Sequence, residues 1–312
     1  MEIVRRLDQF KPLPSCVLTI GSYDGIHRGH HGILTSVVNH AHARNVPSVL
    51  VTFDPHPRHI LDPSADKLSL IMGIDQKLDI IESLGIEIVY VINFTKAFSK
   101  TTATDFLNDT VLPNFNPEYM IVGYDHHFGY KREGSPEFLE DYCSKKAIGL
   151  EVIQKVSDEG HVISSTHIRQ LIKDGFVRRA NFELGSIFGF MAKVVHGAGR
   201  GKDLDFPTAN VIPVEKNQLM PHPGVYFTRG RINGLQLYGM CNFGTRPTFN
   251  EKDLVMEIHF FHDKAVDLYG KEIRVEFLER IRDENKFPSP EDLKSQLIKD
   301  KQKCLELQGK YE

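Results

Sequence analysis

The chain lacks the features that mark secreted, disulfide-rich and membrane-spanning proteins. Its four cysteines are far apart and form no C-x-x-C pair, which argues against a disulfide framework or a zinc site. No run of about 18 apolar residues occurs, and the start, MEIVRRLDQF, lacks the apolar core of a secretory signal. We therefore expect buried free thiols in a soluble, cytoplasmic protein that does not bind membranes.

Strong charge is also missing. Thirty-eight basic and 41 acidic residues give a formal net charge of −3, so no overall field would attract nucleic acid. A hydrophobic content of 41% is ordinary for a globular protein. The length of 312 residues favours two domains, and the oligomeric state stays open.

In the first half of the chain, short apolar segments alternate with helical stretches. CVLTIG, PSVLVTF, IEIVYVI, EYMIVGY and LEVIQKV are typical of buried strands. The helices between them include DQKLDIIESLG and SPEFLEDYCSKKAIG, which we expect to end at Gly85 and Gly149. This alternation predicts an α/β domain in which helices cover both faces of a parallel sheet.

After residues 182–189 the pattern changes to a period of two. In VMEIHFF, Met256, Ile258 and Phe260 share one face, while Glu257 and His259 share the other. Such segments, punctuated by Gly and Pro, predict an antiparallel sheet or a small β-barrel. An amphipathic helix, SPEDLKSQLIKDKQKCLEL, closes the chain. We place the domain boundary near Leu184, which gives domains 1–184 and 185–312.

The segment GSYDGIHRGHHGI, residues 21–33, joins a predicted strand to a predicted helix. A helix start at the carboxyl edge of a parallel sheet offers free N–H groups and a partial positive charge to a phosphate. His27 and His30 lie on the first turn and can donate hydrogen bonds to it. Gly21 and Gly25 allow close backbone approach, and Asp24 lies between them. The plainer alternative is a turn with solvent-exposed histidines.

A second segment, ISSTHIRQLI, also begins a predicted helix. Ser164, Ser165, Thr166 and Arg169 together could bind the outer phosphates of a nucleotide. On its own this pattern more often marks a helix cap.

The second domain begins with VVHGAGRGKDLDFPTAN. Gly199 and Gly201 belong to a flexible loop that could wrap backbone N–H groups around phosphates, although many such loops only connect strands. Thr208 and Asn210 point to the same side of an extended chain, where their oxygens could hold Mg²⁺ between ATP phosphates.

Five segments, GSYDGIHRGH, VTFDPHPR, IVGYDHHFG, ISSTHIR and DFPTAN, occur in the order seen in bacterial bifunctional riboflavin kinase/FMN adenylyltransferases, also called prokaryotic FAD synthetases. The chain resembles this family over nearly its whole length. The resemblance implies a Rossmann-like nucleotidyltransferase domain followed by a riboflavin kinase barrel. It also implies that riboflavin, FMN, FAD and ATP are the substrates and products, with Mg²⁺ as cofactor.

The resemblance further assigns roles to individual residues. His27 and His30 would stabilise charge at the α-phosphate of ATP, with Ser164, Thr166 and Arg169 on the β- and γ-phosphates. Glu257 would accept the proton of the riboflavin 5′-hydroxyl. Flavin contacts would come from His56, Asp125 and Phe128 in the first domain and from Arg282 and Phe287 in the second, although turns at 54–58 and 123–129 are the alternative.

The sequence departs from the family pattern at three places. Ser22-Tyr23 stands where Asn-Phe is usual, His126-His127 where Phe-Arg is common, and Asp205 where the family has Gly. An alternative function follows from the last departure: an FMN adenylyltransferase with a weakened or silent kinase. A flavin carrier without activity is a third hypothesis, but it would need neither Mg²⁺ ligands nor a base.

Asp205 generates the first prediction. A carboxylate near the ATP phosphates should weaken ATP binding to the kinase, and Asp tolerates a left-handed backbone less well than Gly. The substitution Asp205→Gly should therefore lower the apparent KM for ATP in riboflavin phosphorylation. Steady-state kinetics at saturating riboflavin measure this, and an unchanged KM would contradict the hypothesis.

Overall fold

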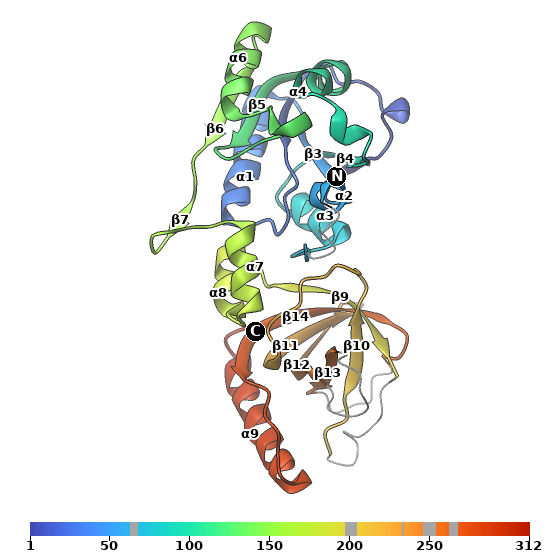
Figure 1. The fold of residues 1–312 in the computed structure, drawn as a ribbon, viewed down its shortest axis with the longest axis vertical. Helices are drawn as coiled ribbons and strands as arrows, with labels where there is room; N and C mark the ends of the chain where they lie inside the picture. Colours follow the sequence, from blue (N-terminus) through green and yellow to red (C-terminus); the bar gives the residue numbers. More distant parts are fainter. Residues whose placement is uncertain (63–67, 197–204, 233, 246–253, 262–267) are drawn as a thin grey trace. The chain divides into compact units, whose positions relative to one another are not determined.

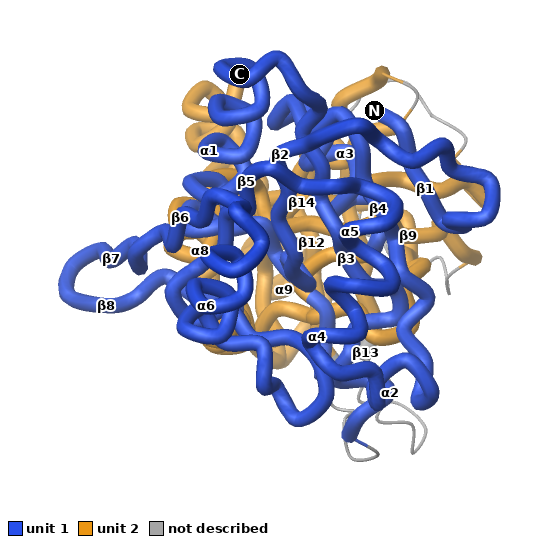
Figure 2. The backbone as a smooth tube through the Cα atoms, turned by 90° about the horizontal axis from the view of Figure 1, so that it is seen from above, with its two compact units in different colours: residues 1–70, 74–165 blue, residues 71–73, 166–312 orange. Residues whose placement is uncertain are grey.

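The computed structural model describes residues 1–62, 68–196, 205–232, 234–245, 254–261 and 268–312. The chain divides into two compact units, shown in Figure 2: Met1–Leu70 with Ile74–Ser165, and Ile71–Gly73 with Thr166–Glu312. The helices between residues 166 and 184 thus group with the second unit. The predicted domain boundary near Leu184 stays a prediction.

The first unit is built on a six-stranded, all-parallel sheet of order β1-β4-β3-β2-β5-β6 (Figure 1). Its strands are β1 (Glu2–Val4), β2 (Cys16–Ile20), β3 (Ser48–Asp54), β4 (Ile88–Asn93), β5 (Pro117–Gly123) and β6 (Gly149–Ile153). All five residues of β2 are buried, as expected where both faces of a sheet are covered. The predicted parallel α/β domain is confirmed.

Helices and a small hairpin complete this unit. They are α1 (Arg28–Arg44), α2 (Pro57–Leu61), α3 (Ile74–Ser83), α4 (Ala103–Asp105), a π-helical segment (Phe106–Val111), α5 (Leu112–Phe115), α6 (Pro136–Lys146) and the strands β7 (Ser157–Asp158) and β8 (His161–Val162). Helix α1 contacts β2, β3 and β5, and Leu18 on β2 packs in a cluster with Phe106, Phe115 and Leu139.

One predicted helix end is wrong. Helix α6 ends at Lys146, and its C-cap residue Ala147 takes the left-handed conformation with φ +57°. Gly149 instead begins β6, where an added Cβ would come within 2.1 Å of the Tyr119 ring. This glycine is therefore required by close packing against a neighbouring strand rather than by the helix end.

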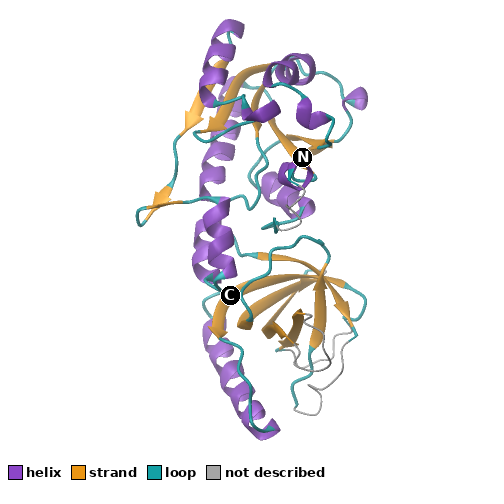
Figure 3. Cartoon of the chain, viewed as in Figure 1, coloured by secondary structure: helices purple, strands orange, loops and turns teal. Residues whose placement is uncertain are grey.

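The second unit contains a closed antiparallel barrel of order β10-β13-β12-β11-β14-β9 (Figure 3). Its elements are α7 (Ser165–Lys173), α8 (Val177–Leu184), β9 (Gly189–Val195), β10 (Ala209–Pro213), β11 (Gly224–Ile232), β12 (Leu235–Thr245), β13 (Leu254–Phe260), β14 (Glu272–Arg282) and α9 (Pro290–Gln308). The sequence prediction of a small barrel with a terminal helix is confirmed.

The alternation along β13 separates the barrel interior from its outer face. Met256 and Ile258 are 2% and 0% exposed, and their cross-strand partners Phe243 and Cys241 are buried with them. The alternate residues of the strand, Glu257 and His259, therefore face outward. Helix α9 covers part of that outer face, where its Cys304 joins a buried cluster with Phe227, Met240 and Leu278.

The barrel core generates the second prediction. Phe277 is fully buried and its ring contacts the rings of Phe188, Phe190 and Tyr226. Phe277→Ala should lower the free energy of unfolding by about 3–5 kcal/mol because it leaves a cavity in a closed core. Urea denaturation followed by circular dichroism measures it. Phe182→Ala, at a position 52% exposed on α8, is the control and should cost less than about 1 kcal/mol.

Candidate active sites

The loop between β2 and α1 has an unusual backbone. Tyr23 adopts φ +48° and Gly25 adopts φ +76°. The Tyr23 ring is 4% exposed, and its hydroxyl forms a 2.6 Å hydrogen bond with the hydroxyl of Thr19. That buried bond holds a non-glycine residue in the left-handed region. Gly21 leaves room for the ring, since a Cβ there would meet Tyr23 Cε2 at 2.7 Å.

His27 and His30 meet at the start of α1. His27 is the N-cap, and its Nδ1 accepts a 3.3 Å hydrogen bond from the His30 backbone N–H. The two imidazoles stack with centroids 3.7 Å apart and planes 15° apart. Because Nδ1 of His27 accepts, the neutral ring carries its proton on Nε2 and can donate it. Nδ1 of His30 is buried and has no hydrogen-bond partner among the described residues.

Burial keeps both histidines neutral. Loss of solvent, and to a smaller extent the nearby His31, lower the pKa of His27 to about 4. The pKa of His30 is also well below its ordinary value, through burial first and then through the charges of His27 and Lys77. At neutral pH the pair therefore offers hydrogen-bond donors without fixed positive charge.

Ser165, the last residue of the first unit, lies beside this loop. Ser165 Oγ donates a 2.7 Å hydrogen bond to the carbonyl oxygen of Asp24. One of the predicted hydroxyl residues therefore contacts the loop between β2 and α1 directly. Ser164 precedes it, and Thr166 and Arg169 follow on α7 in the second unit. Asp24 is 3% exposed.

Sequence reasoning missed Lys77 on α3. Its side chain is buried, and Nζ donates a 2.7 Å hydrogen bond to the carbonyl oxygen of Ser22 in the same loop. The sequence did contain a signal. Lys77 occupies the i+3 position of the apolar stripe formed with Ile74, Leu78 and Ile81, where a lysine is not expected.

The residues predicted to contact flavin in the first unit differ in setting. His56 caps α2 by accepting a 3.2 Å hydrogen bond from the Arg58 backbone N–H, and Asp125 is exposed. Phe128 is 7% exposed and packs against Phe106 and Phe138. Their roles in flavin binding stay predictions.

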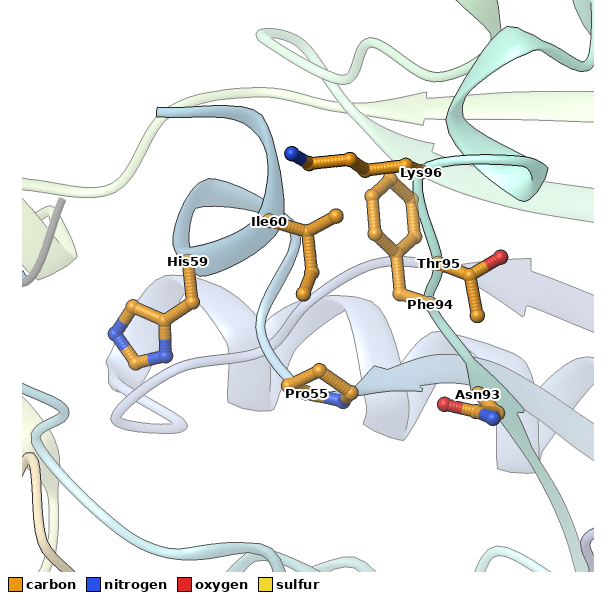
Figure 4. A pocket seen from close by; sticks show the side chains of 7 residues that line it. All are labelled: Pro55, His59, Ile60, Asn93, Phe94, Thr95 and Lys96. Atoms are coloured by element: carbon orange, nitrogen blue, oxygen red, sulfur yellow. The ribbon is translucent and has the colours of Figure 1, made fainter. Parts of the chain in front are cut away.

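A pocket of about 410 Å³ opens where β3 and β4 end (Figure 4). Its wall combines the apolar groups of Pro55, Ile60 and Phe94 with the polar ends of Asn93 and Lys96; His59 and Thr95 complete the lining. None of the three predicted flavin residues of this unit is in the wall. The pocket depends on which strand ends are neighbours, and the sequence pattern did not specify that.

The second candidate site lies on the outer face of the barrel. Glu257 on β13 is directly opposite Asn210 on β10 and Asn242 on β12. Cross-strand partners point to the same side of a sheet, with Cβ atoms about 5 Å apart. Asn210 is 7% exposed, and Thr208 is partly buried two residues before it. Gly199 and Gly201 lie outside the described residues.

The oxygen groups here fit Mg²⁺. A hydroxyl, an amide oxygen and a carboxylate are the ligands this ion prefers, and it usually keeps waters and binds substrate phosphates as well. Within the described ranges, no group of three or more His, Cys, Asp or Glu side chains could form a separate metal cage. The roles of Thr208 and Asn210 as Mg²⁺ ligands stay predictions.

Arg282 has a structural contact of its own. Its guanidinium binds both carboxylate oxygens of the buried Asp300 on α9, with Nε and Nη2 at 2.9 and 2.8 Å from Oδ2. The guanidinium carbon also lies 5.6 Å from the centre of the Phe287 ring. These contacts fasten α9 to the barrel, and the predicted contact of Arg282 and Phe287 with flavin stays a prediction.

Asp205, which stands where the family pattern has Gly, adopts a left-handed backbone with φ +64°. Its carboxylate accepts a 2.6 Å hydrogen bond from Lys294 Nζ on α9, and that contact lowers the pKa of Asp205. The negative charge introduced at this position is thus paired with a lysine.

Comparison with known proteins covers both units. A family model described as FAD synthetase matches residues 10–167, and one described as riboflavin kinase matches residues 184–308. The bifunctional riboflavin kinase/FMN adenylyltransferase of Bacillus subtilis is 32% identical over 93% of this chain and 91% of its own. The protein of the same name from Escherichia coli is 33% identical over 99% of this chain and 98% of its own. The chain belongs to the bifunctional riboflavin kinase/FMN adenylyltransferase family.

A solved structure supports the fold at full length. A Streptococcus pneumoniae protein described as a macrolide-efflux protein superposes with a TM-score of 0.87, at 30% identity, over 96% of this chain and 97% of its own. That description differs from the family to which the sequence comparisons assign this chain. In the part of this chain that the structure describes, no helix is long and apolar enough to cross a membrane.

The buried histidines generate the third prediction, which concerns pH. The pKa of His27 is about 4 in the folded protein and about 6.5 in an unfolded chain. The unfolded state therefore binds the proton more tightly. His27 should contribute a loss of stability of roughly 3 kcal/mol as the pH falls from about 6.5 to about 4. Urea unfolding of the full chain between pH 4 and 7 measures it.

The matched variants isolate this contribution. His27→Asn keeps an N-cap acceptor but cannot titrate, so its stability should depend less on pH than that of the wild type. His42→Gln changes an exposed histidine on the same helix and should leave the profile unchanged. A His27→Asn profile as steep as the wild type would contradict the prediction.

Proposed function

We propose that this chain makes FAD from riboflavin in two ATP-dependent steps. The barrel transfers the γ-phosphoryl group of ATP to the riboflavin 5′-hydroxyl to give FMN. The first unit then transfers the AMP group of a second ATP to FMN and releases pyrophosphate. The observation that carries this proposal is the stacked His27–His30 pair at the start of α1, in a chain that matches both enzyme models of the family.

Adenylyl transfer needs charge stabilisation more than covalent chemistry. An oxygen of the FMN phosphate attacks the α-phosphorus of ATP, and the bond to pyrophosphate breaks. His27, through Nε2–H, and His30 would donate hydrogen bonds to the α-phosphate oxygens as charge builds on them. The start of α1 adds its free N–H groups and partial positive charge. Positioned donors of this kind act without reorganising during the reaction.

The outer phosphates of ATP need a second set of donors. Ser165 already contacts the loop between β2 and α1 through its hydrogen bond to the Asp24 carbonyl oxygen. We assign the β- and γ-phosphates to the hydroxyls of Ser164, Ser165 and Thr166 and to the Arg169 guanidinium, which suits bidentate phosphate contacts. Gly21, Asp24 and Gly25 would form the loop beneath the nucleotide.

The pocket at the ends of β3 and β4 suits the flavin ring. Its wall offers the flat Phe94 ring and apolar surface from Ile60 and Pro55, with Lys96 and Asn93 at polar positions. A volume of about 410 Å³ is in the range of small-molecule sites. His56 lies directly beside Pro55 in the chain.

Phosphorylation in the barrel uses different groups. Glu257 would accept the proton of the riboflavin 5′-hydroxyl as the hydroxyl oxygen attacks the γ-phosphorus of ATP. The bond from the γ-phosphorus to the bridging oxygen breaks, and ADP leaves. Thr208 and Asn210 would hold Mg²⁺, which offsets the negative charge of the ATP phosphates. Asn210 and Asn242 on the flanking strands would orient the Glu257 carboxylate between them.

One observation bears on the alternative of a silent kinase. Asp205 takes the left-handed backbone that Gly would take, and Lys294 holds its carboxylate. The structure thus accommodates both the backbone conformation and the negative charge of Asp205. We therefore infer that the kinase is active.

The fourth prediction separates the two activities within the full chain. Purified protein with riboflavin, ATP and Mg²⁺ should produce FMN and then FAD, resolved by chromatography. His30→Ala should slow FAD formation by roughly 10²–10³-fold, the scale of a lost transition-state donor, and spare FMN formation. Glu257→Gln should slow FMN formation by roughly 10²–10⁴-fold and spare the conversion of added FMN to FAD.

Each variant is the control for the other. Loss of both activities in either one would indicate misfolding or a single shared site. Wild-type protein that forms FAD from FMN but no FMN from riboflavin would favour the adenylyltransferase-only alternative.

A further inference from the structure

Lys77 is a buried cation beside the loop of residues 21–27 in the first unit. It is 5% exposed and lies on α3 within a stripe that is otherwise apolar: Ile74, Leu78 and Ile81. Neither of the two proposed reactions assigns a role to Lys77. Desolvation makes such a position costly for an ammonium group, and burial lowers the pKa of Lys77 accordingly.

The contacts of Lys77 do not balance its charge. Its one hydrogen bond within the described chain is the 2.7 Å bond to the neutral carbonyl of Ser22. No carboxylate of a described residue pairs with it within 4.0 Å, although Asp24 and Asp54 act on it at longer range. An ammonium group has three donors, so two remain for another acceptor.

The bond from Lys77 also orients the loop. The Ser22 carbonyl accepts from Lys77 and, at 3.4 Å, from Thr52 Oγ1. In a trans peptide the following N–H points the opposite way, so these two residues turn the Tyr23 N–H away from themselves. Ser165, through the Asp24 carbonyl, does the same for the N–H of Gly25.

Those two N–H groups are free to bind a ligand. Neither the Tyr23 nor the Gly25 N–H has an acceptor in the described part of the chain, and both residues have left-handed backbones. Backbone N–H groups exposed by a loop of this kind can form a concave site for anions. The unpartnered Nδ1 of His30 lies next to Tyr23, whose ring is 5.0 Å from the His30 ring.

We propose that Lys77 is a positioning residue for adenylyl transfer, which makes the loop of residues 21–27 a cradle for the phosphates of ATP and for pyrophosphate. It fixes the Ser22 peptide and places a positive charge behind the N–H groups. This inference rests on the proposed function of the first unit. It also explains why a lysine occupies a position that would suit an apolar side chain. Burying a charge often adds nothing to folding stability or lowers it.

The test, and fifth prediction, replaces Lys77 in the full chain. Lys77→Met keeps an unbranched side chain of nearly the same length and removes the charge and donors. The probe is pyrophosphate in the reverse reaction, FAD plus pyrophosphate to FMN plus ATP, because only the first unit catalyses it. The KM for pyrophosphate should rise roughly 10-fold or more, the scale of a lost charged hydrogen bond, while the thermal midpoint stays equal or rises. Lys77→Arg should recover most of the loss.

Two controls make the result specific. Lys145→Met removes an exposed lysine of α6 and should change nothing. Riboflavin phosphorylation by Lys77→Met should match the wild type. A wild-type KM for pyrophosphate in Lys77→Met would overturn the inference, and so would a lowered thermal midpoint with equal loss of both activities, which is the result of a purely structural role.

The failure of this inference can be distinguished from failure of the proposed function. Wild-type protein that catalyses adenylyl transfer in neither direction would refute the function. Pyrophosphate can still be tested as a ligand in that case, by thermal shift. A rise in the thermal midpoint of the wild type that is absent from Lys77→Met would support the cradle, and equal shifts in both would refute it.

Discussion

The buried hydrogen bond between the hydroxyls of Tyr23 and Thr19 is the constraint on which the first site depends. It anchors the Tyr23 ring to β2 while the backbone turns left-handed, and so it sets the direction in which the chain enters α1. His27 then falls at the N-cap, and His30 is placed against both His27 and the Tyr23 ring. The geometry of the two imidazoles therefore follows from how one strand ends.

Much of the architecture could be predicted from the sequence because burial leaves a periodic pattern. Continuous apolar runs such as CVLTI become inner parallel strands, and strict alternation around Glu257 separates the two sides of the barrel wall. Helix ends were harder. Gly149 looked like the end of α6, but Ala147 takes the left-handed position and Gly149 makes room for Tyr119. Local propensity and packing both favour glycine, and only the structure separates them.

The parts of the sites that could not be predicted depend on the register between paired strands and on which strands are neighbours in the sheet. The sequence marks Glu257 as outward-facing, but that it lies between Asn210 and Asn242 follows from pairing across three strands, which no local pattern encodes. The pocket beside Phe94 likewise requires β3 and β4 to be neighbours. The resemblance to the family points to Arg282 as a flavin contact, and the structure shows that Arg282 also forms an ion pair with the buried Asp300.

Both sites retain polar groups where packing alone would favour apolar ones. In the first unit, uncharged imidazoles and a buried ammonium surround one loop. Among the described residues, one imidazole nitrogen and two backbone N–H groups there have no hydrogen-bond partner. Such groups cost stability unless a ligand completes them. A polyanion that accepts several hydrogen bonds at once would satisfy them together. The unmet donors and the positive charge therefore point to the same ligand chemistry, and binding it would recover stability that the empty loop lacks.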